Sequence, residues 1–166
     1  MRHKKQHQFI IKSLNCQSLK LKCQTVLDYL FESKVDIALL QETWLKRDDL
    51  NVYSEIHELG YKTYNLTKNS RRGGGLSIIF RPNLTVKRIY IKQEGGFTTF
   101  ENICCIATAN DRKFKIVNLY RPPYSAANPK TVRNFLDEFD IFLALILEHK
   151  GILLIFGDFN VNYLDK

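Results

Sequence analysis

The 166-residue sequence contains no apolar run that approaches the length of a transmembrane helix. The N-terminal residues MRHKKQHQ are basic, but the apolar stretch that follows is too short for the core of a signal peptide, because Lys12 interrupts it after Phe9-Ile10-Ile11. These absences favour an intracellular protein with no membrane-spanning segment.

The sequence also lacks the residue spacings of a zinc site. Cys16 and Cys23 are too far apart for a CxxC pair, and the adjacent Cys104 and Cys105 would face opposite sides of a strand. The four histidines are scattered along the chain. We therefore predict that the cysteines are free and mostly buried thiols.

Three consecutive glycines, Gly73 to Gly75, are not followed by the Gly-Lys-Ser/Thr sequence of a phosphate-binding loop. Such loops lead into a helix whose N-terminus faces the phosphate, whereas these glycines lead into the strand-like run LSIIF. The sequence therefore argues against a nucleotide-binding loop. It predicts a turn, flanked by Arg71 and Arg72, that enters a strand.

The composition is that of a globular domain, with 45% hydrophobic and 25% charged residues and no visible repeat, linker or low-complexity segment. The length suits one domain over residues 1–166.

The net charge of +8 is uneven, because residues 61–121 hold twelve Lys or Arg against three acidic residues. A basic stretch suits a polyanion such as nucleic acid, but Lys also occurs on solvated sheets and at their edges. Charge alone leaves both interpretations open.

Apolar periodicity predicts an α/β fold with three helices, at residues 20–33, 49–59 and 129–150. The expected strands are 9–14, 35–41, 61–65, 76–81, 84–92, 98–109, 112–119 and 152–156. The opening β-α-β unit predicts parallel pairing. The middle strands predict an antiparallel meander that includes a tight hairpin at Asn110-Asp111. Asn128 is expected to cap the last helix, and Pro129 to open it.

Polar groups follow four of these strands at their carboxyl ends: Asn15, Glu42, Tyr120, and Asp158 with Asn160. The run before Asp158, ILLIF, is typical of a strand buried on both faces, and a carboxylate beside such a strand is costly unless it is paired or binds a metal. Ligands in α/β sheets bind at the carboxyl ends of strands. One such residue is equally consistent with a turn. If the four strands lie side by side, the residues converge on one rim and indicate a site.

The motifs SLNCQSL, LQETWL, RGGGLSI, NLYRPP and GDFN, in this order, resemble the endonuclease/exonuclease/phosphatase superfamily. Within it, they resemble the apurinic-type endonuclease domain of non-LTR retrotransposons. The resemblance covers essentially the whole chain and implies a four-layer α/β/β/α sandwich of the DNase I-like type. It implies Mg²⁺-dependent cleavage of DNA phosphodiester bonds, with Mn²⁺ as an alternative ion. It further implies action in the nucleus and a reverse transcriptase domain in the same polyprotein.

The resemblance also implies roles for individual residues. Glu42 would bind the metal, with Asn15 near the metal and the phosphate, and Tyr120 would contact the scissile phosphate. Asp158 would orient or deprotonate the attacking water, and Asn160 would hold the phosphate. These residue types suit the chemistry, because a hard cation prefers oxygen ligands and a carboxylate can serve as a general base. The side chains expected to bind nucleic acid are Arg71, Arg72 and Arg121.

Two departures from the family pattern qualify these expectations. Gln17 stands where relatives often carry an acid or Asn. The sequence given stops at Lys166, six residues after Asn160, before the further Asp and the Ser-Asp-His ending of the family. We therefore expect part of the second sheet to be missing, an apolar face and a sheet edge to be exposed, and this chain as given to be inactive. The alternatives are a non-catalytic retrotransposon remnant and a phosphatase of the same superfamily.

Overall fold

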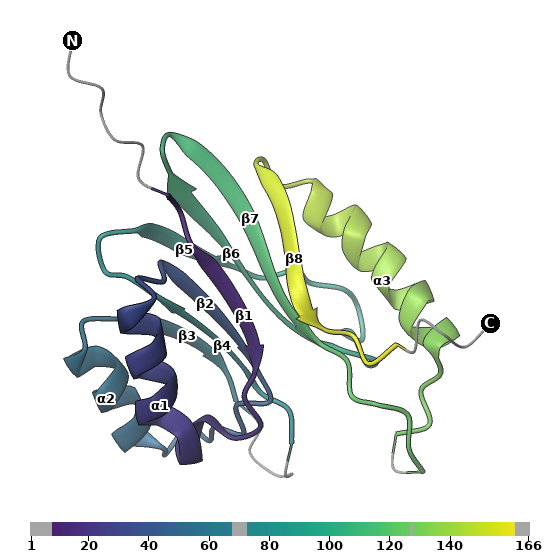
Figure 1. The fold of residues 1–166 in the computed structure, drawn as a ribbon. Coiled ribbons are helices and arrows are strands. Elements are labelled where there is room, and N and C mark those ends of the chain that lie inside the picture. Colours follow the sequence, from purple (N-terminus) through teal and green to yellow (C-terminus); the bar gives the residue numbers. More distant parts are fainter. Residues whose placement is uncertain (1–7, 68–72, 127, 162–166) are drawn as a thin grey trace.

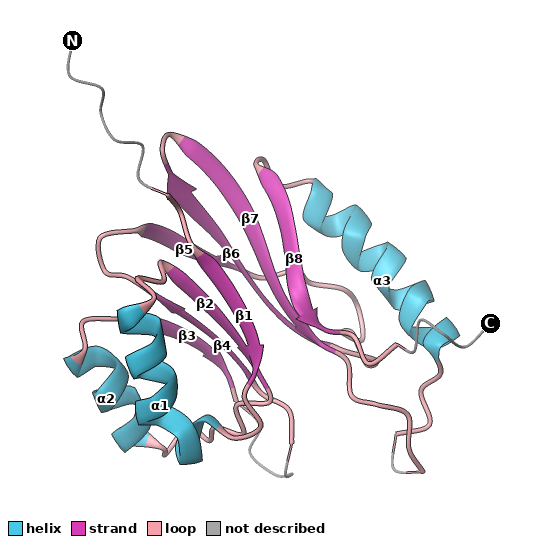
Figure 2. Cartoon of the chain, in the orientation of Figure 1, coloured by secondary structure: helices cyan, strands magenta, loops and turns pink. Residues whose placement is uncertain are grey.

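The structure is a computed structural model that describes residues 8–67, 73–126 and 128–161. Two four-stranded sheets pack face to face, with two helices outside one sheet and one helix outside the other (Figures 1 and 2). The predicted α/β/β/α sandwich is therefore confirmed. Within the described ranges, no helix combines the length and apolar character needed to cross a membrane.

The first sheet has the strand order β1-β2-β4-β3. Strands β1 and β2 pair in parallel, as the β-α-β pattern predicts, because helix α1 connects them. Helices α1 and α2 cover the outer face of this sheet (Figure 1). The elements are β1 (Ile11–Asn15), α1 (Leu19–Glu32), β2 (Ile37–Gln41), α2 (Leu50–Glu58), β3 (Lys62–Leu66) and β4 (Leu76–Phe80).

The second sheet has the strand order β5-β6-β7-β8, and helix α3 packs on its outer face (Figure 1). Strands β7 and β8 are parallel. The predicted hairpin joins β6 to β7, where Asn110 and Asp111 take the left-handed conformation that two-residue hairpins favour. The elements are β5 (Thr85–Ile89), β6 (Glu101–Ala109), β7 (Arg112–Tyr120), α3 (Val132–Leu147) and β8 (Ile152–Asp158).

Three apolar layers hold the sandwich together. Strand β2 shows how they alternate: Ile37 and Leu39 face the second sheet, whereas Ala38 and Leu40 face α1 and α2. A layer of aromatic rings packs between the second sheet and α3, and in it Phe100 contacts Phe142 of the helix. Strand β2 is fully buried because it is covered on both faces.

Two sequence predictions about the path of the chain are wrong. Strands β4 and β5 do not form part of one meander, because the chain passes from the first sheet to the second at residues 81–84. Helix α3 begins at Val132 rather than at Pro129. Thr131 forms its capping box with Asn134, whereas Asn128 donates to the carbonyls of the preceding prolines.

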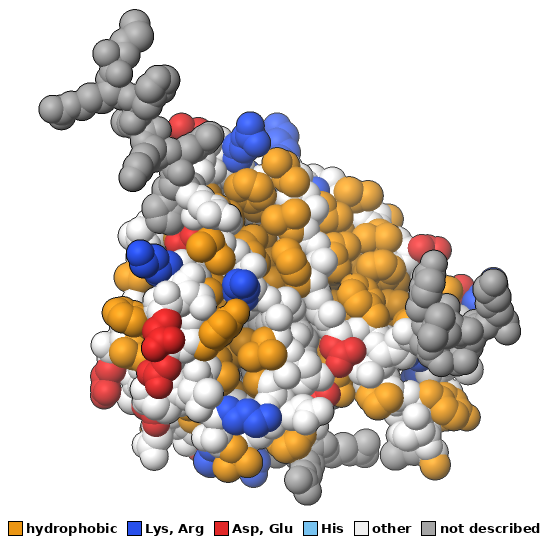
Figure 3. Space-filling model, in the orientation of Figure 1, with side chains coloured by type: hydrophobic (Ala, Val, Ile, Leu, Met, Phe, Trp, Pro, Cys, Tyr) orange, Lys and Arg blue, Asp and Glu red, His pale blue; other side chains and the backbone are white. Residues whose placement is uncertain are grey.

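Strand β8 is not buried on both faces, contrary to the prediction from its apolar run. Every residue of β8 is at least partly accessible, and Ile152 is 48% exposed. Strands β8 and β1 end the two sheets on the same side of the sandwich, and each has one neighbouring strand in the described parts of the chain. Figure 3 shows exposed hydrophobic side chains gathered on this face. An exposed apolar face and open sheet edges were both expected.

All four cysteines are free and buried, as predicted. Burial raises the pKa of the Cys16 thiol to about 11 and that of Cys105 to about 12. At neutral pH these thiols are therefore protonated and poor nucleophiles.

Helix α3 is tied to the loop before β6 by the Glu138 carboxylate, which accepts hydrogen bonds of 2.7–3.1 Å from the backbone N–H and hydroxyl groups of Thr98 and Thr99. Burial alone would raise the pKa of Glu138, but these donors together hold it below its ordinary value. The ionised form therefore stabilises the fold above the unfolded-state pKa of about 4.3, and this contribution disappears as pH falls through the folded-state pKa.

The Glu138→Gln variant is accordingly expected to lose about 1 kcal/mol of stability at pH 7, a modest value because solvent screens the site. Urea unfolding at pH 7 and at acidic pH measures the effect, and the difference from the wild type should shrink at acidic pH. Asp137→Asn, one residue earlier and exposed, is the matched control. A pH-independent difference would contradict this explanation.

Candidate active site

The carboxyl ends of β1, β2, β7 and β8 meet at one end of the sandwich. The sequence predicts this convergence if the four strands lie side by side, and the structure arranges them as two parallel pairs in different sheets. The rim forms because the two pairs pack against each other, and Figure 1 shows the arrowheads of β1 and β8 close together. Asn15, Tyr120 and Asp158 are the last residues of their strands, and Glu42 directly follows β2.

Asn15 connects the two sheets at this rim. Its side-chain nitrogen donates to Glu42 Oε1 at 2.7 Å and to Asp158 Oδ2 at 2.8 Å. One amide group thus holds two carboxylates that belong to different sheets and lie far apart in the sequence. The structure therefore brings together three of the residues that the sequence singles out.

Tyr120 is hydrogen-bonded to Glu42, lies within reach of the charge of Asp158, and is 5% exposed. Burial raises the pKa of its phenol well above the ordinary range. The negative charges of Glu42, Asp158 and Glu101, together with a hydrogen bond to Glu42, raise it further. Tyr120 therefore stays neutral and can act as a hydrogen-bond donor at the rim.

The turn after β8 is fixed by Arg121. Asn160 donates its backbone N–H to Asp158 Oδ1 at 3.1 Å and its side-chain N–H to the Arg121 carbonyl at 2.7 Å. The Arg121 guanidinium donates to the Asn160 carbonyl at 2.7 Å and lies over the Phe135 ring. Asp158 and Asn160 are thus held in a defined geometry relative to β7.

The placement of Arg121 corrects the expectation that it contacts nucleic acid. The side chain is only 2% exposed and bonds to backbone carbonyls within the protein. Its role in this structure is to position the segment that carries Asp158. Arg71 and Arg72, which share the predicted role, lie outside the described residues.

The rim is also where the backbone is strained. Of the eight non-glycine residues with positive φ in the described ranges, five follow the carboxyl ends of β1, β2 and β8. Such conformations cost free energy and concentrate at functional sites, so their clustering favours a site over ordinary turns. The five residues are Gln17, Ser18, Glu42, Trp44 and Asn160.

A further residue of the site, Glu101, was treated in the sequence only as a counter-charge in the basic segment. It is buried, and its Oε2 accepts the backbone N–H of Gly75 at 2.7 Å. The carbonyls of Gly74 and Gly75 accept the N–H groups of Trp44 and Thr43 at 3.0 and 3.1 Å. Glu101 therefore fixes the backbone of Gly75. Gly74 and Gly75 in turn fix Thr43 and Trp44, the residues that follow Glu42. A Cβ at Gly74 would overlap the Glu101 carboxylate, which explains the glycine there.

Glu101→Ala is expected to leave the buried N–H of Gly75 without its acceptor and to cost about 1–3 kcal/mol. Thermal unfolding measures this cost, and amide hydrogen exchange should become faster at Gly75. Glu94→Ala, which removes an exposed acid from the segment before β6, is the control and should change neither measurement. Unchanged exchange at Gly75 in Glu101→Ala would show that this carboxylate does not fix the backbone of Gly75.

A buried polar network lies directly below Glu42 and Tyr120. The Gln41 side chain donates to Asn118 Oδ1, and Asn118 donates to the carbonyls of Leu40 and Ser77, both at 3.0 Å. Because Gln41 and Asn118 precede the rim residues on β2 and β7, these bonds fix the two strands relative to each other. Sequence reasoning missed this network, since the only signal is an amide within each apolar run.

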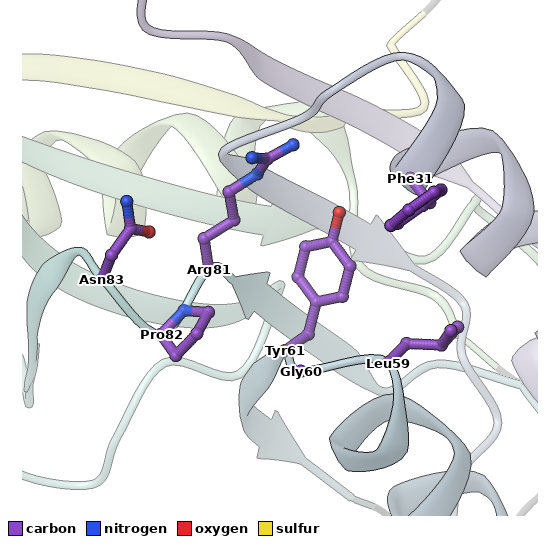
Figure 4. A pocket seen from close by; sticks show the side chains of 7 residues that line it. All are labelled: Phe31, Leu59, Gly60, Tyr61, Arg81, Pro82 and Asn83. Atoms are coloured by element: carbon purple, nitrogen blue, oxygen red, sulfur yellow. The ribbon is translucent and has the colours of Figure 1, made fainter.

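A cleft lined in part by Arg81 lies at the end of the first sheet that is opposite to the rim (Figure 4). Its lining includes Phe31 and Tyr61, and Figure 4 shows the Tyr61 ring between the side chains of Phe31 and Arg81. Arg81 Nε donates to the Val35 carbonyl at 3.0 Å and lies 3.8 Å from Asp36, so this cation is used within the fold. The rim is therefore the better candidate for a catalytic site.

Residues 13–165 match the Endonuclease/Exonuclease/phosphatase family. The chain belongs to this family. Members of the family are hydrolases that act on phosphodiester bonds. No curated protein matches the sequence significantly.

Solved structures that the chain resembles support the family fold. A TDP2 protein from D. rerio, humanized by 14 mutations, is 17% identical with a TM-score of 0.65, over 93% of this chain and 67% of that one. The catalytic domain of human Nocturnin is 16% identical with a TM-score of 0.63, over 91% and 63%. The endonuclease domain of TRAS1, a telomere-specific non-LTR retrotransposon, is 16% identical with a TM-score of 0.65, over 93% and 60%. The chain thus spans about two thirds or less of these structures.

Proposed function

We propose that this chain is a Mg²⁺-dependent endonuclease domain that cleaves phosphodiester bonds in DNA and nicks the target site of a non-LTR retrotransposon. The proposal rests on the Asn15 bridge, which holds Glu42 and Asp158 from two sheets around one amide at 2.7 and 2.8 Å. Family membership, the five motifs and the basic middle segment support the choice of substrate.

The residues of the rim fit a hard divalent cation. Glu42 and Asp158 share one neutral donor, and the charges that act on Tyr120 are all negative. Carboxylates this close favour a bound cation, which relieves their repulsion. No group of three or more His, Cys, Asp or Glu suited to a metal occurs in the described part of the chain. Glu42 and the Asn15 amide oxygen would hold the ion, with water completing its shell, as suits Mg²⁺ or Mn²⁺, and Asp158 beside them would remain free to act on the attacking water.

The bound ion would offset negative charge on the phosphate, and the protein residues supply the remaining functions. Asp158, oriented by the N–H of Asn160, accepts a proton from the attacking water. Tyr120, held neutral, donates a hydrogen bond to the phosphate. Asn160, whose side chain donates to the Arg121 carbonyl, would hold the phosphate in place.

Arg71 and Arg72 flank the glycine loop in sequence and would contact the DNA backbone. The similarity to the TRAS1 endonuclease domain supports a retrotransposon origin, and with it nuclear action and a reverse transcriptase domain in the same polyprotein.

A second candidate is a catalytically inactive member of the family that binds nucleic acid without cutting it. One observation favours it: among the described residues, no histidine lies at the rim. His57 is at the C-terminal end of α2, and His149 lies between α3 and the start of β8, so both are at the opposite end of the sheets. The described residues thus supply a general base but no imidazole to protonate the leaving group.

Nicking of supercoiled plasmid distinguishes these candidates. The endonuclease proposal predicts nicked circles with Mg²⁺ and none with EDTA. DNA binding without nicking would support the inactive candidate. Turnover of small phosphoesters without DNA cleavage would indicate a phosphatase, and the absence of both binding and turnover would contradict the proposal.

A further inference from the structure

A second cleft, of about 460 Å³, lies at the same end of the sandwich as the rim but toward the other edge of the two sheets. Strand β3 ends beside it at Leu66, which pairs with Leu76, and Leu76 in turn pairs with Gln41 next to Glu42. The lining side chains include two arginines and no acid; they are Arg47, Tyr53, Asn65, Leu66, Thr67 and Arg88. The cleft is therefore a cationic extension of the catalytic end.

Arg88 is held in place by its neighbours. Its guanidinium donates to the Asn65 carbonyl at 3.2 Å and lies 4.9 Å from the centre of the Tyr90 ring. Tyr90 is 67% exposed, so the pair faces solvent rather than the core. No carboxylate within the described ranges forms an ion pair with Arg88.

Arg47 reaches the cleft from the loop after Glu42. Tyr53 donates to the Lys46 carbonyl at 2.9 Å, and the Lys46 N–H donates to Asp49 Oδ2 at 3.0 Å, which fixes the backbone beside Arg47. Burial raises the pKa of Tyr53, and the negative charges of Asp49 and Asp48 raise it further, so these two acids act on this side of the cleft. Asp49 is paired with Lys20, so part of this negative charge is already compensated.

We propose that Arg47 and Arg88 bind a backbone phosphate of the nucleic acid that flanks the cleaved bond. The inference rests on the proposed function and extends it to substrate length. Arginine suits this task, because its planar guanidinium can bond two phosphate oxygens at once.

The order of the strands gives the distance from the rim. Arg88 on β5 lies three strands from Asp158 on β8. The register places Arg88 level with Leu154, through Cys105 and Ile116, and therefore four residues before Asp158 along the strands. With strands about 4.8 Å apart and a rise of about 3.3 Å per residue, the separation is about 14 Å across the sheet and about 13 Å along it, or about 20 Å in all. One strand of a duplex advances about 3.4 Å per nucleotide, so the bound phosphate is about six nucleotides from the cleaved bond.

Binding of a fluorescent DNA duplex, measured by anisotropy in EDTA between about 50 and 200 mM salt, tests this site without cleavage. Because one phosphate accounts for a slope of about 0.9, the double variant Arg47→Gln/Arg88→Gln should lower the slope of log affinity against log salt by about 0.9, and each single variant should lower it by part of this amount. Arg112→Gln is the matched control, because this exposed arginine in the β6–β7 hairpin lies at the opposite end of the sheets. It should leave the slope unchanged.

The outcomes separate this inference from the proposed function. If both single variants and the double variant bind DNA with the wild-type slope, Arg47 and Arg88 do not bind a backbone phosphate, and the endonuclease proposal is unaffected. If the wild-type chain binds no DNA, both fail. Arg47 is exposed, so its variant tests the cleft even if Arg88→Gln unfolds, and Arg88→Lys should recover most of the lost salt dependence.

Discussion

Asp158→Asn is expected to lower Mg²⁺-dependent nicking of supercoiled DNA by a factor of roughly 10²–10⁴, the usual contribution of a general acid or base. Asparagine has the same shape as aspartate, and its amide oxygen can still accept the N–H of Asn160. It cannot accept a proton from water at neutral pH. The loss should therefore appear in the rate of cleavage, together with a smaller loss of thermal stability, because the new amide nitrogen would face the Asn15 nitrogen that donates to Asp158 Oδ2.

Asp140→Asn provides the control, because it makes the same chemical change at an exposed position on α3, away from the rim. This variant should nick at the wild-type rate. If Asp158→Asn also nicks at that rate, Asp158 does not act as the base, and the role assigned to it is wrong.

Gly157→Ala is expected to destabilise the protein by about 3 kcal/mol, at the upper end for overpacking. Gly157 pairs with Leu119 on β7, and a Cβ at this position would overlap the Leu119 carbonyl and neighbouring backbone. That backbone cannot easily move, because β7 is an interior strand bonded to β6 as well. The substitution should also displace Asp158, the next residue in the chain.

Gly96→Ala separates this overlap from the general cost of replacing a glycine at positive φ. Gly96 has a φ of 70°, but no atom lies within 4 Å of the position a Cβ would take. We expect a loss of about 1 kcal/mol there from backbone conformation alone. Urea unfolding of both variants gives the comparison, and equal losses would contradict the close approach at Gly157.

The sequence predicts those parts of the fold that depend on local patterns. The parallel pairing of β1 with β2 follows from a helix placed between two apolar runs, and the Asn110-Asp111 turn follows from residues that tolerate positive φ. The convergence of Asn15, Glu42 and Asp158 could be anticipated because each lies at the carboxyl end of a strand. Their chemical roles stay predictions.

The features that the sequence did not reveal depend on contacts between distant segments. No local signal shows that β5 leaves the sheet of β4, because the turn at residues 81–84 would serve a hairpin equally well. Arg121 follows a strand like the other rim residues, yet its side chain turns inward to bond the Asn160 carbonyl. Glu101 acquires its role only through Gly75, which is 26 residues earlier in the chain.

Direct measurement of metal binding tests the central claim that the rim holds a divalent cation. Titration of the chain with Mn²⁺, followed by electron paramagnetic resonance, should show one bound ion that Mg²⁺ displaces. Glu42→Gln should weaken this binding at least about tenfold, since it removes the carboxylate that is proposed to bind the ion. Absence of a bound ion, or equal affinity in the wild type and in Glu42→Gln, would contradict the assignment of the rim as a metal-dependent active site.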